Sequence, residues 1–454
     1  MPPPRDLHHS LRLITLSGCL YMVYNTGVSS PLITKFLENL GATPTQIGLY
    51  AGIPMLALSM QFVGALLSRR LSRRKPAFMF CMILGRLLYL PVMLIPPMFP
   101  ALRNPTGVAW MLAFLFGGNV LNHMASPLWY SWMGDLIPRR MLNRYWGVRQ
   151  TWSSATWVLS YLLIMSLSWS EHFPLMPLVV TVGCFSVLAG VVDIALFAKV
   201  HEPNFSRQPP AHPFRILFEP LLDARYRKLV AFFGSWSAIS SCAAALMGFY
   251  LFVGLHMTVW QATLLWCVQG VGTALSARGW GKVAQRRGCV FLVRICFIFK
   301  SLIAAAFLCV TPANAFPVLL PVLFFDGMWN AGFGVAHNGL MFQASPENHR
   351  PMFVAAMIGF CGLFGGLSAI LGGRYVSYAG GGLAATGFLD LNAYQMVFLF
   401  SLVMRVLMAV WAWRIAPDQP KRSDPWISDL MLVWPFRALR YPVGLYSGWK
   451  REKD

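Results

Sequence analysis

Twelve apolar stretches, each long enough to cross a membrane as a helix, constrain the fold of this chain more than any other feature. A helix needs about 20 residues to cross roughly 30 Å of hydrocarbon. Hydrophobic residues make up 57% of the 454-residue chain, more than soluble domains usually contain. The sequence therefore predicts an all-α integral membrane protein with twelve transmembrane helices. The predicted spans cover residues 11–31, 46–67, 76–97, 107–135, 148–169, 175–199, 229–254, 259–277, 289–310, 315–343, 352–377 and 394–415.

The positive charge collects in every second gap between these spans. If both termini and the even-numbered loops are assigned to one side, that side holds 31 of the 37 basic residues. The positive-inside rule then predicts a multi-pass protein of the cell membrane with both termini in the cytoplasm. Contact of the basic loops with anionic membrane lipids accounts for the formal net charge of +21. No nucleic-acid partner is expected.

The spans divide six and six around a polar, basic and proline-rich segment. We predict an N-terminal six-helix bundle over 1–200, a cytoplasmic linker over 201–228 and a C-terminal six-helix bundle over 229–416. A basic cytoplasmic tail follows over 417–454. Its mixture of aromatic and basic residues leaves two alternatives, a helix lying in the membrane interface or a disordered tail.

Internal repetition supports the division into two bundles. A shift of 208 residues places Asn122 on Asn330, and a shift of 213 places the Arg73–Arg74 pair on Arg286–Arg287. The two offsets differ by only five residues, so corresponding helices keep their order. Two related six-helix halves are therefore expected.

Two loops carry a shared glycine and basic-pair motif: GALLSRRLSRRKP from Gly64 to Pro76 and GWGKVAQRRG from Gly279 to Gly288. An acidic, proline and arginine segment follows the fourth span as GDLIPRRMLNRYWGVR, and SPENHR stands after the tenth. With these motifs and the helix count, the chain resembles the major facilitator superfamily over about residues 11–415. The motifs do not indicate a subfamily.

The resemblance implies two pseudo-symmetric six-helix bundles that rock about a central cavity lined by helices 1, 4, 7 and 10. It implies a monomeric transporter without a cofactor. Family members have an acidic residue in the repeated loop that helps to latch the cytoplasmic gate, and both copies here lack it. Asp135 is the expected substitute. The predicted cytoplasmic gate comprises Arg73, Arg74, Asp135, Arg144, Arg286 and Arg287.

Polar and aromatic side chains within the cavity-lining spans are the candidate substrate ligands. The alternative is that the amides bond neighbouring helices and the tryptophans lie at the membrane interface. Asn122 and Asn330 occupy matching places in the two halves, which favours a binding role. The predicted substrate-binding residues are Tyr24, Asn25, Asn119, Asn122, His123, Trp129, Trp236, Asp326, Trp329 and Asn330.

Asp326 lies about ten residues into its span, where a carboxylate needs a partner to stay charged. One interpretation is a proton or cation site that biases alternating access. The other is a structural pair with Lys300. On the outer helices lie Arg86, Asp193, Lys300 and Arg405, for which we expect either snorkelling or pairing within a half, such as Arg86 with Asp193. Gly362 and Gly366 predict close helix packing or a hinge.

Several functions are disfavoured by the motifs. The Gly281–Lys282 dipeptide lacks the rest of a phosphate-binding loop, so ATP is not expected to drive the protein. No GxSxG or HExxH pattern indicates an enzyme. The sequence predicts a secondary transporter for a sugar-like or amphipathic organic solute, with proton coupling through Asp326. The alternative is a transporter-like sensor or scaffold in the same membrane.

Overall fold

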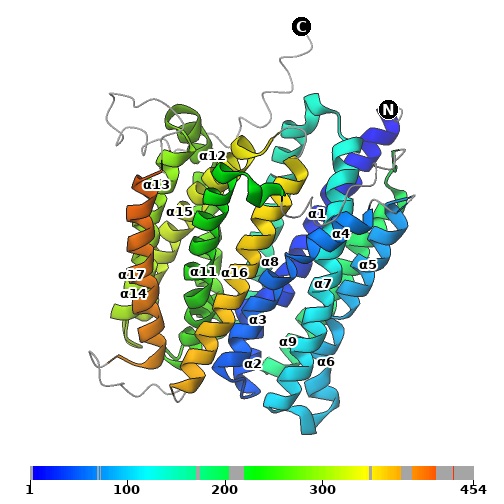
Figure 1. Ribbon diagram of the computed structural model, residues 1–454. Coiled ribbons are helices and arrows are strands. Elements are labelled where there is room, and N and C mark those ends of the chain that lie inside the picture. The colour runs from blue at the N-terminus through cyan, green and yellow to red at the C-terminus, as the bar shows by residue number, and fades with distance from the viewer. Residues whose placement is uncertain are drawn as a thin grey trace. The chain divides into compact units, whose positions relative to one another are not determined.

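The computed structural model describes residues 4–68, 71, 73–169, 174–203, 219–346, 350–379, 391–415 and 433. Within these residues all regular structure is helical (Figure 1). The tail over 417–454, apart from residue 433, and linker residues 204–218 lie outside the described residues. The helices are α1 (Pro4–Ser29), α2 (Pro31–Asn39), α3 (Pro44–Ala57), α4 (Met60–Ser68), α5 (Lys75–Leu87), α6 (Leu90–Met98), η1 (Pro100–Leu102), α7 (Pro105–Leu136), α8 (Arg139–Trp169), α9 (Leu175–Ala195), η2 (Leu196–Lys199), α11 (Ala224–Val253), α12 (Val259–Arg287), α13 (Cys289–Lys300), α14 (Leu302–Cys309), α15 (Ala315–Ala344), α16 (Arg350–Tyr378) and α17 (Ala393–Trp413).

The predicted all-α membrane fold is confirmed, and the helices are consistent with twelve spans. Nine helical segments of the described chain are long and apolar enough to cross a membrane. The helices α1, α8 and α12 are also long, with 26, 31 and 29 residues, but they are more polar. Consecutive pairs such as α3 with α4, α5 with α6, and α13 with α14 make up single predicted spans.

Interruptions within these spans have local chemical causes. Pro91, the second residue of α6, cannot donate a backbone hydrogen bond to Leu87, so α5 ends there. The break between α13 and α14 at Ser301 contains no proline. There the Ser301 hydroxyl donates to the Phe297 carbonyl at 3.1 Å, a side-chain bond that competes with the helical ladder and bends helices.

The described residues group by their contacts into two units. Unit 1 contains Met1–Leu264 with Ser345–Ser401, and unit 2 contains Leu265–Ala344 with Leu402–Asp454. Unit 1 thus includes α11 and α16 besides the first six spans. The division into the bundles 1–200 and 229–416 stays a prediction.

Within unit 1, α16 runs alongside α3 (Figure 1) at a distance that only glycines permit. A Cβ atom on Gly52 would lie 2.8 Å from the Gly366 carbonyl oxygen, and one on Gly366 would lie 2.8 Å from the Gly52 oxygen. A Cβ on Gly362 would lie 2.5 Å from the Met55 carbonyl oxygen. The close packing expected from Gly362 and Gly366 is therefore confirmed, with α3 as the partner.

Polar contacts at one end of α3 and α16 add to this packing. The Thr45 hydroxyl donates to the Ser377 hydroxyl at 2.8 Å. Thr43 begins α3 with a capping box, because its side chain accepts from Gln46 N and the Gln46 side chain accepts from Thr43 N. The start of α3 is thus fixed both by its own cap and by the end of α16.

Unit 2 is built around α15, which packs against α12, α13 and α14. A Cβ atom on Gly327 would lie 1.9 Å from the Gln269 carbonyl oxygen, so α15 and α12 touch through their backbones. The indole of Trp280 on α12 donates to the Met328 carbonyl at 2.8 Å. These contacts fix the face of α15 that carries Asp326.

Candidate functional site

A cluster of buried charged and amide side chains lies within unit 2. Asp326 and Asn330 stand four residues apart on α15, so they share one face of that helix. Gln269 on α12 and Asn330 both donate to Asp326 Oδ2 at 2.8 Å. Lys300 Nζ lies 3.6 Å from Asp326 Oδ1 and also bonds to Asn330 Oδ1. The alternative interpretation, a structural pair of Asp326 with Lys300, therefore has a direct contact in its favour.

Arg405 on α17 joins the cluster through the backbone. Its Nη1 donates to the Lys300 carbonyl oxygen at 2.7 Å. Lys300 is the last residue of α13, and carbonyl groups at a helix end have no partner within the helix. The break at Ser301 thus provides the acceptor that holds the Arg405 guanidinium.

The cluster contains more cations than anions. Lys300, Asp326 and Arg405 are 7%, 6% and 4% exposed, and Asp326 interacts electrostatically with both cations. Two basic side chains therefore interact with one buried carboxylate. A change in the charge of Asp326 would alter the electrostatic surroundings of both cations.

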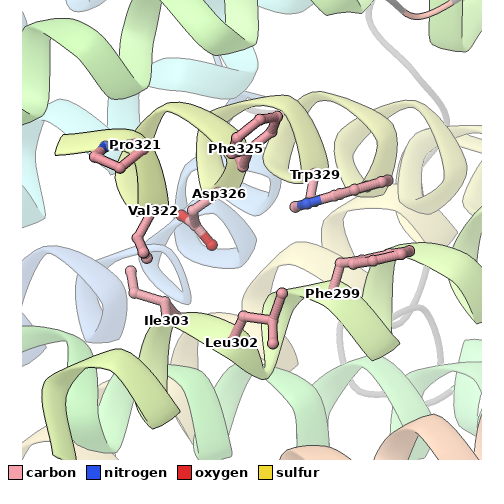
Figure 2. Close-up of a pocket in the computed structure, with 8 residues that line it drawn as sticks. All are labelled: Phe299, Leu302, Ile303, Pro321, Val322, Phe325, Asp326 and Trp329. Atoms are coloured by element: carbon pink, nitrogen blue, oxygen red, sulfur yellow. The ribbon is translucent and has the colours of Figure 1, made fainter. Parts of the chain in front are cut away.

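Aromatic and aliphatic side chains form a pocket beside this cluster. Trp329 stacks on Phe299 with ring centroids 4.2 Å apart and an interplanar angle of 5°. A pocket of about 350 Å³ lies between α14 and α15, with Asp326 among its lining residues (Figure 2). The predicted residues Asp326, Trp329 and Asn330 are thus brought together.

A second buried ion pair lies within unit 1. Arg86 Nη2 on α5 lies 3.4 Å from Asp193 Oδ2 on α9, as expected from the sequence. The Ser17 hydroxyl on α1 donates to Asp193 Oδ1. The Arg86 guanidinium carbon lies 3.9 Å from the centre of the Tyr24 ring and 5.1 Å from that of Tyr21. Tyr24 thus contacts a cation through its ring.

The predicted substrate ligands of α7 differ in how they are engaged. Asn119 is buried and donates to the Tyr89 hydroxyl and the Leu115 carbonyl, both at 2.8 Å, as a packing amide does. Asn122 Oδ1 is buried and accepts no hydrogen bond from the described residues. His123 is half-buried, and the ring of Trp129 lies 5.3 Å from the Arg149 guanidinium carbon.

Two further predicted ligands lie elsewhere in unit 1. Asn25 is half-buried on α1, one residue after Tyr24. Trp236 is buried on α11, 4% exposed.

The predicted gate residues include one close pair. Arg74 Nη1 donates to Asp135 Oδ2 at 2.6 Å and to the Ser131 hydroxyl at 2.9 Å. Glu202 accepts from the Arg74 backbone N–H at 2.7 Å, which ties the chain after α9 to the same place. This direct contact supports the prediction that Asp135 takes the place of the missing loop carboxylate.

The structure describes the side chains of three of the four other gate residues. Arg73 is exposed, and Arg286 and Arg287 lie in the last turn of α12. The Arg287 guanidinium carbon lies 5.6 Å from the Phe291 ring. The side chain of Arg144 lies outside the described residues. The gate role of the six residues stays a prediction.

Sequence reasoning missed the contribution of Gln269, which contacts Asp326 from a helix that was not expected to line the cavity. Its signal was an amide in the middle of α12.

Sequence reasoning also missed a second correspondence between the halves. Lys300 stands 214 residues after Arg86, and Arg405 stands 212 residues after Asp193. The acidic position of the first half is therefore basic in the second.

Comparisons with known proteins agree on the class of the chain. The sequence model of the Major Facilitator Superfamily matches residues 14–373. No curated protein sequence matches. A mutant of the nucleoside transporter NupG is similar in structure, with a TM-score of 0.68 at 13% identity over 89% of this chain and 99% of that one.

Two further solved structures are similar at comparable levels. A bacterial homologue of the human lysosomal transporter Spinster, inward-facing and unoccupied, gives a TM-score of 0.64 at 14% identity over 96% of this chain and 98% of that one. A bacterial homologue of the iron transporter ferroportin, inward-facing, gives 0.63 at 14% identity over 91% and 99%. At these identities the likeness concerns the fold.

Proposed function

Because this chain belongs to the major facilitator superfamily, whose model matches residues 14–373, we propose that it moves a small organic solute across the cell membrane by alternating access. The family consists of transporters, not enzymes, and the similar solved structures are transporters of different cargoes. In this proposal both termini are cytoplasmic, because the basic loops mark that side.

The buried cluster around Asp326 carries the proposal that transport is coupled to protons. A carboxylate in a membrane-spanning helix keeps its charge only when it is paired. Protonation of Asp326 removes the negative charge with which Lys300 and Arg405 interact, so it changes the free energy of the arrangement around it. Proton binding therefore changes the relative free energy of two arrangements, as coupled transport requires.

The solute class is proposed from the chemistry of the predicted ligands. Amides such as Asn25 and Asn122 suit hydroxyl groups, and aromatic rings such as Trp129 and Trp329 suit a sugar ring or an aromatic body. Asn122 Oδ1 accepts no hydrogen bond from the described residues, which supports its use by a ligand. We favour a sugar-like or amphipathic solute of little net charge.

The Arg74–Asp135 pair is the proposed centre of the cytoplasmic gate. It joins the start of α5 to the end of α7 and, through Glu202, to the chain after α9. The proposed gate adds Arg73, Arg144, Arg286 and Arg287 on the same cytoplasmic side.

The decisive experiment first identifies a solute and then tests coupling. Purified protein is screened by thermal shift against sugars, nucleosides, amino acids, organic acids and amphipathic compounds, because a ligand at about 100 times its Kd adds roughly 2.7 kcal/mol of stability. Uptake of each hit into proteoliposomes is then measured with and without a pH gradient. We expect gradient-driven uptake by the wild type and its loss in Asp326→Asn.

Asp193→Asn is the matched control, because Asp193 is also a buried aspartate in an ion pair. If folded, this variant should keep the response of uptake to the gradient. Gradient-driven uptake that persists in Asp326→Asn would exclude Asp326 as the coupling residue. Binding without transport by the wild type would favour a sensor instead.

A further inference from the structure

The pocket between α14 and α15 is lined by apolar side chains and by one carboxylate, that of Asp326. The exposed Leu302 and Phe325, at 55% and 44%, stand among its lining residues, so the pocket opens on a surface of unit 2. Its volume of about 350 Å³ is at the lower end of small-molecule sites, which span roughly 300–1,000 Å³. The pocket therefore suits a small, largely apolar ligand.

The two oxygens of Asp326 differ in their partners. Oδ2 accepts hydrogen bonds from Gln269 and Asn330. Oδ1 accepts none from the described residues, and Lys300 Nζ stays 3.6 Å away from it. In Figure 2 the carboxylate points from α15 toward the side of Leu302 and Ile303. A buried carboxylate oxygen in this position favours a ligand that brings a hydrogen-bond donor.

The charge of the surroundings decides which kind of donor fits. Lys300 and Arg405 both interact with Asp326, so the cluster carries one positive charge more than negative. An ammonium ligand would add a third cation to one carboxylate in a medium of low dielectric constant. A hydroxyl or a neutral N–H group donates to Asp326 without this repulsion.

We propose that this pocket binds an uncharged amphipathic molecule whose aromatic or aliphatic body fills the space between α14 and α15 and whose hydroxyl or N–H group donates to Asp326. The stacked Trp329 and Phe299 rings provide an apolar wall for the body. The inference deepens the proposed function by naming a ligand class at its coupling residue. Binding can nevertheless be measured without transport.

The test uses a matched set of fluorinated ligands with the full-length protein in nanodiscs. Binding of 4-(trifluoromethyl)phenol, 4-(trifluoromethyl)toluene and 4-(trifluoromethyl)benzylammonium is followed by fluorine NMR at a pH where the phenol is neutral. The phenol and the toluene differ mainly in a hydroxyl group. A hydrogen bond to a charged acceptor predicts about tenfold tighter binding of the phenol. The ammonium ligand should bind more weakly than the phenol.

Substitutions separate the pocket from the membrane. Val322→Phe fills the pocket and should abolish saturable binding of the phenol, with Leu302→Trp as the second variant if Val322→Phe does not fold. Leu371→Phe enlarges an exposed side chain of α16, 64% exposed, and should leave binding unchanged. Asp326→Asn should reduce the preference for the phenol over the toluene.

Equal binding of phenol and toluene, or phenol binding that survives both pocket-filling variants, overturns the inference and leaves partition into lipid as the explanation. Tightest binding of the ammonium ligand would also overturn it. Phenol binding with this pattern in a protein that transports nothing would sustain the inference and reject the proposed transport. Coupled transport without phenol binding would reject the inference and sustain the proposed transport.

Discussion

At the scale of single residues, two buried ion pairs differ in the side chains that surround their carboxylates. Asp193 has one cation within 4 Å, Arg86, and a hydroxyl donor from Ser17. Asp326 has Lys300 at 3.6 Å and two amide donors. Both carboxylates also interact with a further arginine, Arg149 at Asp193 and Arg405 at Asp326. Asp326 in addition lines a pocket, so it is the residue proposed to respond to protons, and the Arg86–Asp193 pair is expected to be structural.

The Arg86–Asp193 pair predicts a coupled effect on stability. Arg86→Leu or Asp193→Leu alone leaves a buried charge without its partner, a change that typically destabilises by about 3–5 kcal/mol. The double substitution removes both charges and should destabilise less than either single one. Thermal unfolding midpoints of the three variants in one detergent test this. A double variant whose loss equals the sum of the single losses would contradict the coupling.

The sequence predicts those features of the candidate site that depend on residues close together in the chain. Asp326 is conspicuous in an apolar span, and its spacing to Asn330 places both on one helix face. The contact from Gln269 depends on how α12 packs on α15, which no local pattern encodes. The break at Ser301 lacks a proline, so the carbonyl that holds Arg405 was not foreseen.

At the scale of elements, α3 and α16 approach each other closely within unit 1. Backbone meets backbone at Gly52 and Gly366, so a side chain at either position must push the helices apart. Helices that touch through glycines can separate without breaking interlocked side chains, which suits an interface that opens and closes.

Glycine substitution tests this contact. Gly52→Val should reduce transport at least tenfold, because its side chain collides with the Gly366 carbonyl and with Ile370. Gly281→Val is the control, since a Cβ atom there meets no atom within 4 Å. Uptake rates normalised to folded protein provide the measurement. Equal rates in Gly52→Val and the wild type would show that the contact can widen without consequence.

A reversible cross-link tests whether the same contact must open. The Thr45 and Ser377 hydroxyls lie 2.8 Å apart, so cysteines at both positions place two sulfur atoms within reach of a disulfide. In a background without native cysteines, oxidation of Thr45→Cys/Ser377→Cys should stop uptake, and reduction should restore it. Each single variant should be unaffected by oxidation. Full uptake by the oxidised double variant would mean that α3 and α16 stay together throughout transport.

At the scale of the whole molecule, the hydropathy and charge of the sequence predict the fold but not how the helices pack. The apolar spans and the basic loops are properties of the chain itself, so the helical membrane fold follows from the sequence. The grouping of α11 and α16 with the first six spans depends on contacts between helices distant in sequence, which periodicity does not encode.

The predicted orientation is open to a direct test. Asn314 is exposed between α14 and α15, on the side predicted to face away from the cytoplasm, and Arg278 is exposed in α12 near the predicted cytoplasmic side. In a background without native cysteines, a membrane-impermeant maleimide should label Asn314→Cys in intact cells. It should label Arg278→Cys only after permeabilisation. The reverse pattern would invert the topology.

The exchange of Asp193 for Arg405 at corresponding positions makes the two halves chemically unequal. A chimera of two first halves would contain two Arg–Asp pairs and would lack the cluster of Lys300, Asp326 and Arg405. We expect such a protein to lose the response to protons that is proposed for Asp326. The difference between the halves thus confines the proposed response to one of them.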